Sequence, residues 1–313
     1  MRRALLIVVA IAFLLLNLGC KPDVPPPVCT GSGTVTHRDL RYAQSPGTAA
    51  GLQSLDLYLP VRPDACGPAP IVVYVHGGGF IRGDKANKIT SKTNLFNREG
   101  WAFASLNYRL VGAAGVGPTN GVYPAAEQDI AAALAYLEAQ AVMRDIDPQR
   151  LMLLGHSAGA FLVSLTSTDA AFSEGVSRRL DDVTCTASLD TTYDIAAQIA
   201  RGGTEEAMFR NAFGNDPEIW DQASPAKNVT PGKGIPSFHI VTRGAPARVA
   251  QSQSFGASLR DAGVSADVQV VAGLSHEEVN EAVGEPGDTV VTPPLMAFLR
   301  SCAASREASR QEF

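Results

Sequence analysis

Short, almost continuous apolar runs recur along most of the chain, separated by longer stretches of mixed polarity. Runs of five or six residues without polar alternation are typical of strands that are buried on both faces of a sheet. They predict strands over residues 71–75, 102–106, 150–154, 184–189, 237–242 and 267–272. Such strands belong to a mostly parallel sheet.

Helical patterns occupy the stretches between these runs, most clearly over residues 125–141, where Ile130, Leu134 and Leu137 fall on one helix face. Residues 52–59 alternate apolar and polar positions, which predicts an antiparallel strand at the edge of the sheet. Strand–helix alternation of this length predicts one α/β domain, an open and mostly parallel twisted sheet with helices on both faces. Active sites in such sheets lie at the carboxyl ends of the strands.

The N-terminus carries a targeting signal. A short basic head precedes an apolar run over residues 4–18, which is short for a membrane span and predicts a signal peptide over residues 1–19. An uncleaved N-terminal anchor is the alternative. Gly19-Cys20 resembles the end of a bacterial lipobox, although Asn17 departs from its preference for leucine. We therefore expect an exported protein attached to a membrane through lipidated Cys20, with ordinary signal-peptidase cleavage as the alternative.

The remaining chain divides by composition. Residues 20–34 are rich in Pro and Gly and suit a tether. Residues 35–302 form the folded domain, in which residues 191–236 are the largest insertion and could form a small cap. Residues 303–313 are polar and charged, so we expect a disordered tail there.

Composition excludes several classes of protein. With 45% hydrophobic and 18% charged residues among 313, the chain has enough apolar material for a core. The net charge of −5 argues against nucleic-acid binding. No cysteine or histidine cluster has zinc spacing, so no metal site built on cysteines is expected.

Four cysteines remain besides Cys20, an even number that allows two disulfides in an exported protein. Cys185 begins a predicted parallel strand and Cys302 ends the final helix, so both lie toward the amino edge of the sheet. We expect these two to pair. Cys29 and Cys66 then pair by elimination.

A candidate nucleophile follows the run at residues 150–154, which leads directly into residues 155–159 (GHSAG) and then into a helical pattern. A serine at a strand-to-helix turn is held in a strained backbone with its Oγ exposed above the sheet. The free N–H groups and the dipole at the helix start favour developing negative charge. Ser157 is therefore predicted to be a nucleophile, and a glycine-rich structural turn is the alternative.

A second glycine motif, residues 76–80 (HGGGF), follows the run at residues 71–75. Consecutive glycines let the backbone approach a ligand closely, and N–H groups preset for an oxyanion contribute ~3 kcal/mol each in a transition state. A flexible glycine turn is the alternative. His76 is expected to be structural within this loop.

These motifs resemble the α/β-hydrolases, and specifically the hormone-sensitive-lipase-like and feruloyl-esterase-like (BD-FAE) carboxylesterases. The resemblance covers most of residues 50–300. Its other motifs are Gly83-Asp84, Asn107-Tyr108-Arg109, Pro124-Ala125 with Asp129, Asp147-Pro148-Gln149-Arg150, and Ser275-His276. It implies that Ser157 is the nucleophile and that Gly78, Gly79 and Ala158 supply the oxyanion-hole N–H groups.

The chain has five histidines that could serve as the general base. His37 precedes the first strands of the predicted domain, His239 lies within a predicted strand, and His156 adjoins the nucleophile. His276 lies in a loop after the last predicted strand, from which the base reaches the nucleophile in the family, and the Ser…His order fits. We expect His276 to be the general base; a solvated loop histidine is the alternative.

The orienting acid departs from the family pattern. It usually follows the strand that corresponds to residues 237–242, but residues 243–251 contain no carboxylate. Asp190, directly after the preceding strand, is the first candidate, because some hydrolases of this fold place the acid there. Asp194 is the second. Glu277, another carboxylate or no acid at all remain open.

The resemblance implies a serine carboxylesterase that hydrolyses a small ester, with a short acyl chain by default, through an acyl-enzyme and without a cofactor. No protein partner is predicted. An amidase or peptidase with the same machinery and a catalytically dead, lipid-anchored binding protein are the alternatives. Met208, Phe209, Phe213 and Trp220 of the insertion could line an acyl pocket or pack on the core.

Overall fold

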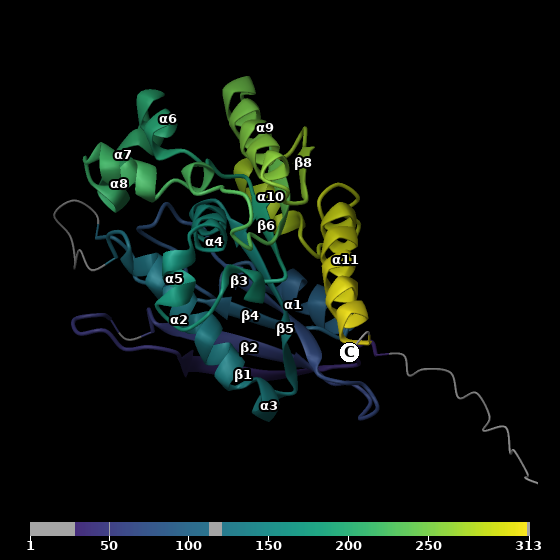
Figure 1. Ribbon diagram of the computed structural model, residues 1–313. Coiled ribbons are helices and arrows are strands. Elements are labelled where there is room, and N and C mark those ends of the chain that lie inside the picture. Colours follow the sequence, from purple (N-terminus) through teal and green to yellow (C-terminus); the bar gives the residue numbers. More distant parts are fainter. Residues whose placement is uncertain (1–28, 50, 113–120, 312–313) are drawn as a thin grey trace, which may run out of the picture.

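The computed structural model describes residues 29–49, 51–112 and 121–311. Eight strands form one sheet in the order β1-β2-β4-β3-β5-β6-β7-β8 (Figure 1). Their bounds are β1 Thr34–Arg41, β2 Ser54–Pro60, β3 Ala69–Val75, β4 Ala102–Leu106, β5 Ile146–His156, β6 Cys185–Leu189, β7 Ser237–Thr242 and β8 Ala266–Val270.

The six strands predicted from apolar runs are all present, as β3 to β8, and they pair in parallel. Every residue of β3, β4 and β6 is buried, which explains why these strands have no polar alternation. The predicted α/β class, with antiparallel strands at the N-terminal side, is confirmed.

The prediction that residues 52–59 form an edge strand was wrong. They form β2, which pairs antiparallel with β1 on one side and with β4 on the other. The edge strand on this side of the sheet is β1, which sequence patterns did not indicate because its eight residues are largely polar and exposed. His37 therefore lies within the first strand and not before it, and β1 begins at Thr34, the last residue assigned to the tether.

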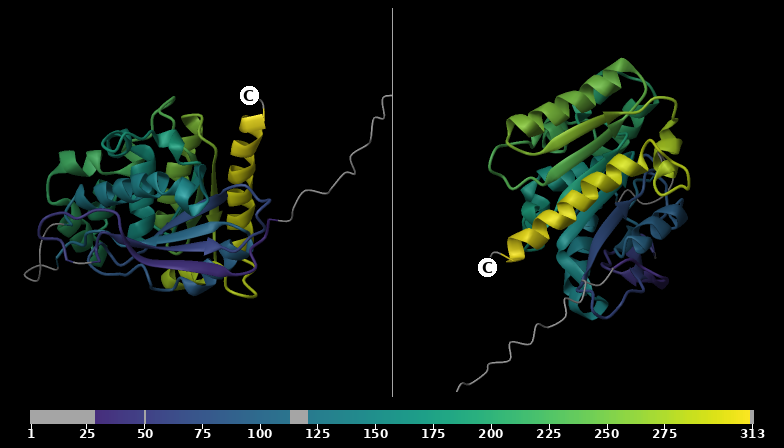
Figure 2. Two further views of the ribbon diagram at one scale, coloured as in Figure 1. Left: turned by 90° about the horizontal axis from the view of Figure 1, so that it is seen from below. Right: turned by 90° about the vertical axis from the view of Figure 1, so that its right-hand side faces the viewer.

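Helices cover both faces of the sheet. Their bounds are α1 Thr90–Arg98, α2 Ala125–Ala139, α3 Ala141–Arg144, α4 Ala158–Thr168, α5 Ala170–Glu174, α6 Ile195–Ala200, α7 Thr204–Phe213, α8 Pro217–Gln222, α9 Pro246–Asp261, α10 His276–Ala282 and α11 Thr292–Gln311. Along β3, alternate side chains enter two apolar clusters: Ile71 and Val73 pack with α2 and α4, whereas Val72 packs with α1 and α11. Figure 2 shows α11 crossing one face of the sheet.

The C-terminal segment corrects another expectation. Residues 303–311, expected to be disordered, continue α11 as far as Gln311. The segment is rich in Ala, Arg, Glu and Gln, which favour helices, and buried Cys302 and Ala303 fix the preceding turn against the sheet. No helix among the described residues is both long and apolar enough to span a membrane.

Both expected disulfides are confirmed. Cys185 at the start of β6 is bonded to Cys302 of α11, and Cys29 is bonded to Cys66. The first bond joins residues 117 positions apart and ties the last helix to the centre of the sheet. Residues 1–28, with the predicted signal peptide and Cys20, lie outside the described residues.

Candidate active site

The candidate nucleophile stands between β5 and α4. Ser157 has φ 55° and ψ −122°, a positive-φ conformation that non-glycine residues rarely adopt. The neighbouring glycines are required by space: a Cβ on Gly155 would lie 2.4 Å from the Gly159 carbonyl oxygen, and one on Gly159 would lie 2.1 Å from the Val75 carbonyl oxygen. The strained turn and its close packing therefore lift the Ser157 side chain to the carboxyl end of the sheet.

His276 is the first residue of α10, and its imidazole reaches Ser157. Ser275 caps this helix and forms a capping box with Glu278, which fixes the position of the first turn. Nε2 of His276 lies 2.8 Å from Oγ of Ser157, and its Nδ1 lies 2.6 Å from Oδ2 of Asp190. The structure thus brings the three predicted residues into one hydrogen-bonded chain.

Asp190 follows β6 and is completely buried. Arg243 and Arg248 also donate to its carboxylate, through Nε at 2.8 Å and 3.0 Å respectively. Burial alone would raise the pKa of Asp190, but the hydrogen bond from His276 and the two guanidinium groups outweigh it and lower that pKa to about 2. The carboxylate is therefore ionised at neutral pH.

The other acid candidates lie elsewhere. Asp194 caps α6 by accepting the Ala197 N–H at 2.9 Å, a structural position. Glu277 lines the pocket at Ser157. The contacts that Arg243 and Arg248 make with Asp190 were not predicted. The sequence did contain a sign of them, because both arginines lie in the segment where the family pattern places a carboxylate.

The remaining histidines have other neighbours. His156 donates from Nε2 to the His276 carbonyl oxygen at 2.9 Å, and burial lowers its pKa to about 3, so it is neutral and supports the loop. His76 donates from Nδ1 to the Gly77 carbonyl oxygen and stacks on a tyrosine, as expected for a structural residue. His37 contacts Arg144, and His239 contacts Asp267.

The glycine loop after β3 lies directly against the nucleophile. A Cβ on Gly77 would approach that of Ser157 to 2.9 Å, and one on Gly78 would lie 1.9 Å from the Arg82 carbonyl oxygen. Gly78 has φ 121° and Gly79 has φ 62°, so both positions favour glycine. Gly78, Gly79 and Ala158 line the same pocket as Ser157 and His276, where the predicted oxyanion hole requires them.

This pocket has a volume of about 410 Å³, and its walls are part apolar and part polar. Met208 and Phe209 of α7 line it, with Thr191, Thr192 and Glu205 nearby. Of the other aromatic residues of the insertion, Phe213 is buried against Phe80 and Phe161, and Trp220 lies beside Arg210. Two of the four candidates for an acyl pocket therefore line it.

Comparison with families of known proteins decides the affiliation of the chain. The model of the BD-FAE family matches residues 55–257, more than half of the chain, and this range includes Ser157, Asp190 and the glycine loop. The chain belongs to the BD-FAE family. The resemblance drawn from its motifs is thereby confirmed.

Relatives of this BD-FAE protein include esterase LipC of Mycobacterium tuberculosis, 26% identical over 263 residues, which cover 76% of this chain and 59% of LipC. The ethyl acetate hydrolase of Pseudomonas putida is 25% identical over 233 residues, 71% of this chain and 70% of the relative. The chain thus spans little more than half of LipC. Esterase B of Lactobacillus rhamnosis has the same fold, with a TM-score of 0.72, 22% identity and 90% of each chain covered.

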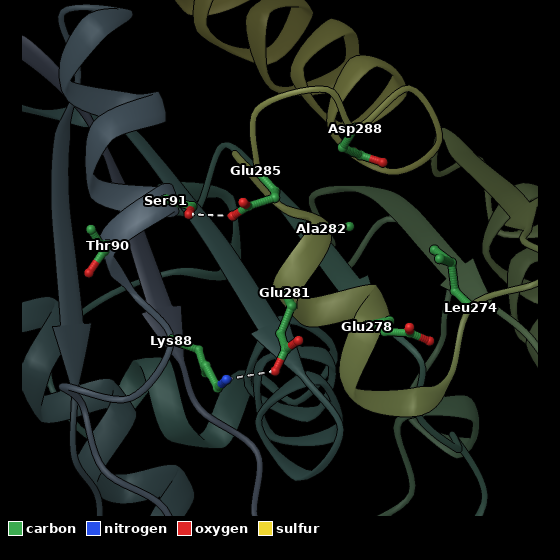
Figure 3. A pocket seen from close by; sticks show the side chains of 9 residues that line it. All are labelled: Lys88, Thr90, Ser91, Leu274, Glu278, Glu281, Ala282, Glu285 and Asp288. Carbon is green, nitrogen blue, oxygen red and sulfur yellow. Dashed lines mark hydrogen bonds and ion pairs between the residues drawn. The ribbon is translucent and has the colours of Figure 1, made fainter.

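A second cavity of this BD-FAE protein, of about 680 Å³, shares no lining residue with the pocket at Ser157 (Figure 3). Four carboxylates line it, and each already has a partner: Glu281 pairs with Lys88, Glu285 accepts from Ser91, Glu278 accepts from Ser275, and Asp288 accepts from the start of α11. Among the described residues, no group of three or more His, Cys, Asp or Glu side chains could hold a metal ion.

Proposed function

We propose that this protein is a serine carboxylesterase that hydrolyses esters with short acyl chains through an acyl-enzyme. The observation that carries the proposal is the chain of contacts from Ser157 to His276 and Asp190, at 2.8 Å and 2.6 Å, in a pocket lined by the glycine loop. These three groups have the chemistry and the order of a serine-hydrolase triad.

In the proposed reaction, Oγ of Ser157 attacks the ester carbonyl while Nε2 of His276 accepts the hydroxyl proton. The carbonyl oxygen becomes an oxyanion beside the backbone N–H groups of Gly78, Gly79 and Ala158. Collapse of this intermediate breaks the ester bond, and the leaving alkoxide takes the proton from His276. A water molecule then attacks the acyl-enzyme by the same route in reverse and releases the acid.

Three observations support a short acyl chain. Met208 lines the pocket and lies so close to the oxyanion loop that a Cβ on Gly79 would be 2.8 Å from its Sδ, which limits the space beside the nucleophile. One relative is named an ethyl acetate hydrolase. Esterase B has been described with a C4-C4 tributyrin phosphonate as its inhibitor. Acetyl and butyryl esters are therefore the first substrates to test.

A serine-directed phosphonate and two chromogenic esters test this function. We expect the phosphonate to add its mass at Ser157, and p-nitrophenyl acetate and butyrate to be hydrolysed by the native protein but not by Ser157→Ala. The matching p-nitroanilides distinguish an amidase. Labelling elsewhere, or full hydrolysis by folded Ser157→Ala, contradicts the proposal.

We also propose that the protein is exported and attached to a membrane through Cys20. The two disulfides support an oxidising compartment, because such bonds persist outside the cytosol. Expression of the full chain with a labelled fatty acid tests the attachment. Label and membrane association that disappear in Cys20→Ser are expected; a soluble, unlabelled native protein contradicts the anchor.

A further inference from the structure

The segment after β7 departs from the family pattern in its charge. Residues 243–251 lack the expected carboxylate and contain two arginines instead. Nε of Arg243 donates to Oδ2 of Asp190 at 2.8 Å, and Nε of Arg248 donates to Oδ1 at 3.0 Å. Arg243 and Arg248 lie in the segment that usually carries the acid, and they bind Asp190, which follows the neighbouring strand β6.

We propose that Arg243 and Arg248 are positioning residues, which hold the orienting acid at the end of β6, and that Glu205 of α7 balances their charge and couples the insertion to the triad. The proposal rests on the proposed esterase function, because the proposed role is exerted through Asp190 and His276, although Glu205 and Arg248 also line the pocket at Ser157.

The first argument is the geometry of Asp190. Its φ of 51° lies in the left-handed region, and its N–H donates to the Val241 carbonyl oxygen at 2.7 Å. Nη2 of Arg248 donates to the Asp190 carbonyl oxygen at 3.2 Å, in addition to the contact with the carboxylate. The guanidinium thus fixes both the backbone and the side chain of this strained residue, and Arg243 blocks rotation of Oδ2 away from the imidazole.

The second argument is the balance of charge. Nη1 of Arg248 lies 3.0 Å from Oε1 of Glu205, and Oε2 of Glu205 accepts from Nε2 of Gln198 at 2.6 Å. A chain of hydrogen bonds therefore runs from α6 and α7 to Asp190. The formal charges of Asp190, Glu205, Arg243 and Arg248 cancel beside the imidazolium that forms during the reaction. Arg201 adds a further positive charge, because its guanidinium interacts with Glu205 and donates to Oε1 of Gln198, and the substitutions below leave it unchanged.

Other titratable groups face His276 as well. His156 lies with its ring centroid 4.6 Å from that of His276 and is neutral, while Glu277 and Arg82 line the same pocket. Lys92 of α1 donates to the Asn280 carbonyl oxygen from the buried side of α10. None of these four groups is altered by the substitutions below, so they contribute a constant background.

Charge balance predicts opposite effects for two neutralising substitutions. Arg248→Gln removes a positive charge near the imidazole, so protonation of His276 becomes easier and the acid limb of the kcat profile moves to higher pH by ~0.5 or more. Glu205→Gln leaves Arg248 uncompensated, so that limb moves to lower pH. Arg243→Gln is expected to act in the same direction as Arg248→Gln.

The experiment measures kcat and kcat/KM for p-nitrophenyl butyrate against pH in the native protein, in Arg248→Gln, in Glu205→Gln and in the variant that combines these two substitutions. We expect Arg248→Gln to lower kcat by ~10-fold or more, because the carboxylate loses its fixed orientation. The double variant loses one charge of each sign and keeps the native net charge, so its acid limb moves back toward the native position. Arg248→Lys keeps the charge and is expected to keep the native limb with a partial loss of kcat.

Matched controls exist on the same helices. Arg260→Gln makes the same change on α9, where Arg260 donates to the Ala266 carbonyl oxygen, and Glu206→Gln makes the same change on α7, where Glu206 pairs with Arg210. Both are expected to leave the profile unchanged. Folded variants whose limbs do not move, or move in the same direction, overturn the inference. A native protein without Ser157-dependent turnover instead contradicts the proposed function.

Discussion

Asp190 and Glu127 are both withdrawn from solvent, with 0% and 1% of their surface exposed, but their surroundings are opposite. Asp190, at the end of β6, accepts hydrogen bonds from two arginines and from His276. Glu127 lies in the first turn of α2, and its Oε2 has no hydrogen-bond partner among the described residues. The nearby guanidinium of Arg109 binds Asp129 instead.

The two carboxyl groups consequently titrate in opposite directions. Burial raises the pKa of Glu127 to about 8, so this side chain is mostly protonated at neutral pH. Burial acts in the same direction on Asp190, but hydrogen bonds and cations reverse the effect and lower its pKa to about 2. Burial therefore raises the pKa of both carboxyl groups, and hydrogen-bond donors and cations determine whether the group is nevertheless ionised. The fold keeps it where the proposed chemistry needs an anion.

The largest expected effect is on catalysis at Asp190. Asp190→Asn is expected to lower kcat for p-nitrophenyl butyrate by ~10⁴-fold, because an amide neither fixes the imidazole tautomer nor stabilises the imidazolium. Asp194→Asn, which alters the cap of α6, and Glu127→Gln serve as controls and are expected to stay within a few-fold of the native rate. A large loss in Asp194→Asn with an active Asp190→Asn would transfer the role of the acid to Asp194.

The same contrast shows what sequence patterns could predict. The strained turn at Ser157 and the close backbone approach of the glycine loop at Gly78 were predicted, because a strand-to-helix turn and a glycine loop are each specified by adjacent residues. Strands buried on both faces were found for the same reason. The edge strand β1 was missed because its residues are polar and its pairing with β2 is not visible in local periodicity.

Contacts between distant strand ends were beyond local patterns. Arg248 and Asp190 are 58 residues apart in the sequence, and the sequence indicated only that the carboxylate usually found after β7 was missing. Glu127 lies one turn before Ile130 and so shares the apolar face of α2. That its Oε2 has no partner among the described residues, while Arg109 binds Asp129 instead, could not be read from this pattern. Which cation meets which carboxylate is decided by the sheet order, which had to be observed.

The next effect concerns stability at Glu127. A carboxyl group whose pKa is raised by folding binds a proton more tightly in the native state, so stability falls as pH rises from the unfolded value of 4.5 through about 8. Glu127→Gln resembles the protonated side chain and does not titrate. We expect the variant to raise Tm by ~5 °C above pH 8 and to change it little below pH 5. Thermal unfolding at several pH values measures this, and equal Tm changes at all pH values would refute the assignment.

The smallest effect is the acid sensitivity contributed by Asp190. Here folding lowers the pKa from 3.8 to about 2, so the native state is stabilised above pH 4 and loses ~2 kcal/mol as pH falls through about 2.

Other carboxylates also titrate in this range, so the informative quantity is the slope of unfolding free energy against pH, compared between native protein and Asp190→Asn. We expect a shallower slope in the variant, although its stability is lower at neutral pH because Arg243 and Arg248 lose their anion. Urea unfolding between neutral pH and pH 2 gives both slopes. Identical slopes would mean that the arginines do not hold the carboxylate in its charged form, which would contradict the explanation given for the contrast with Glu127.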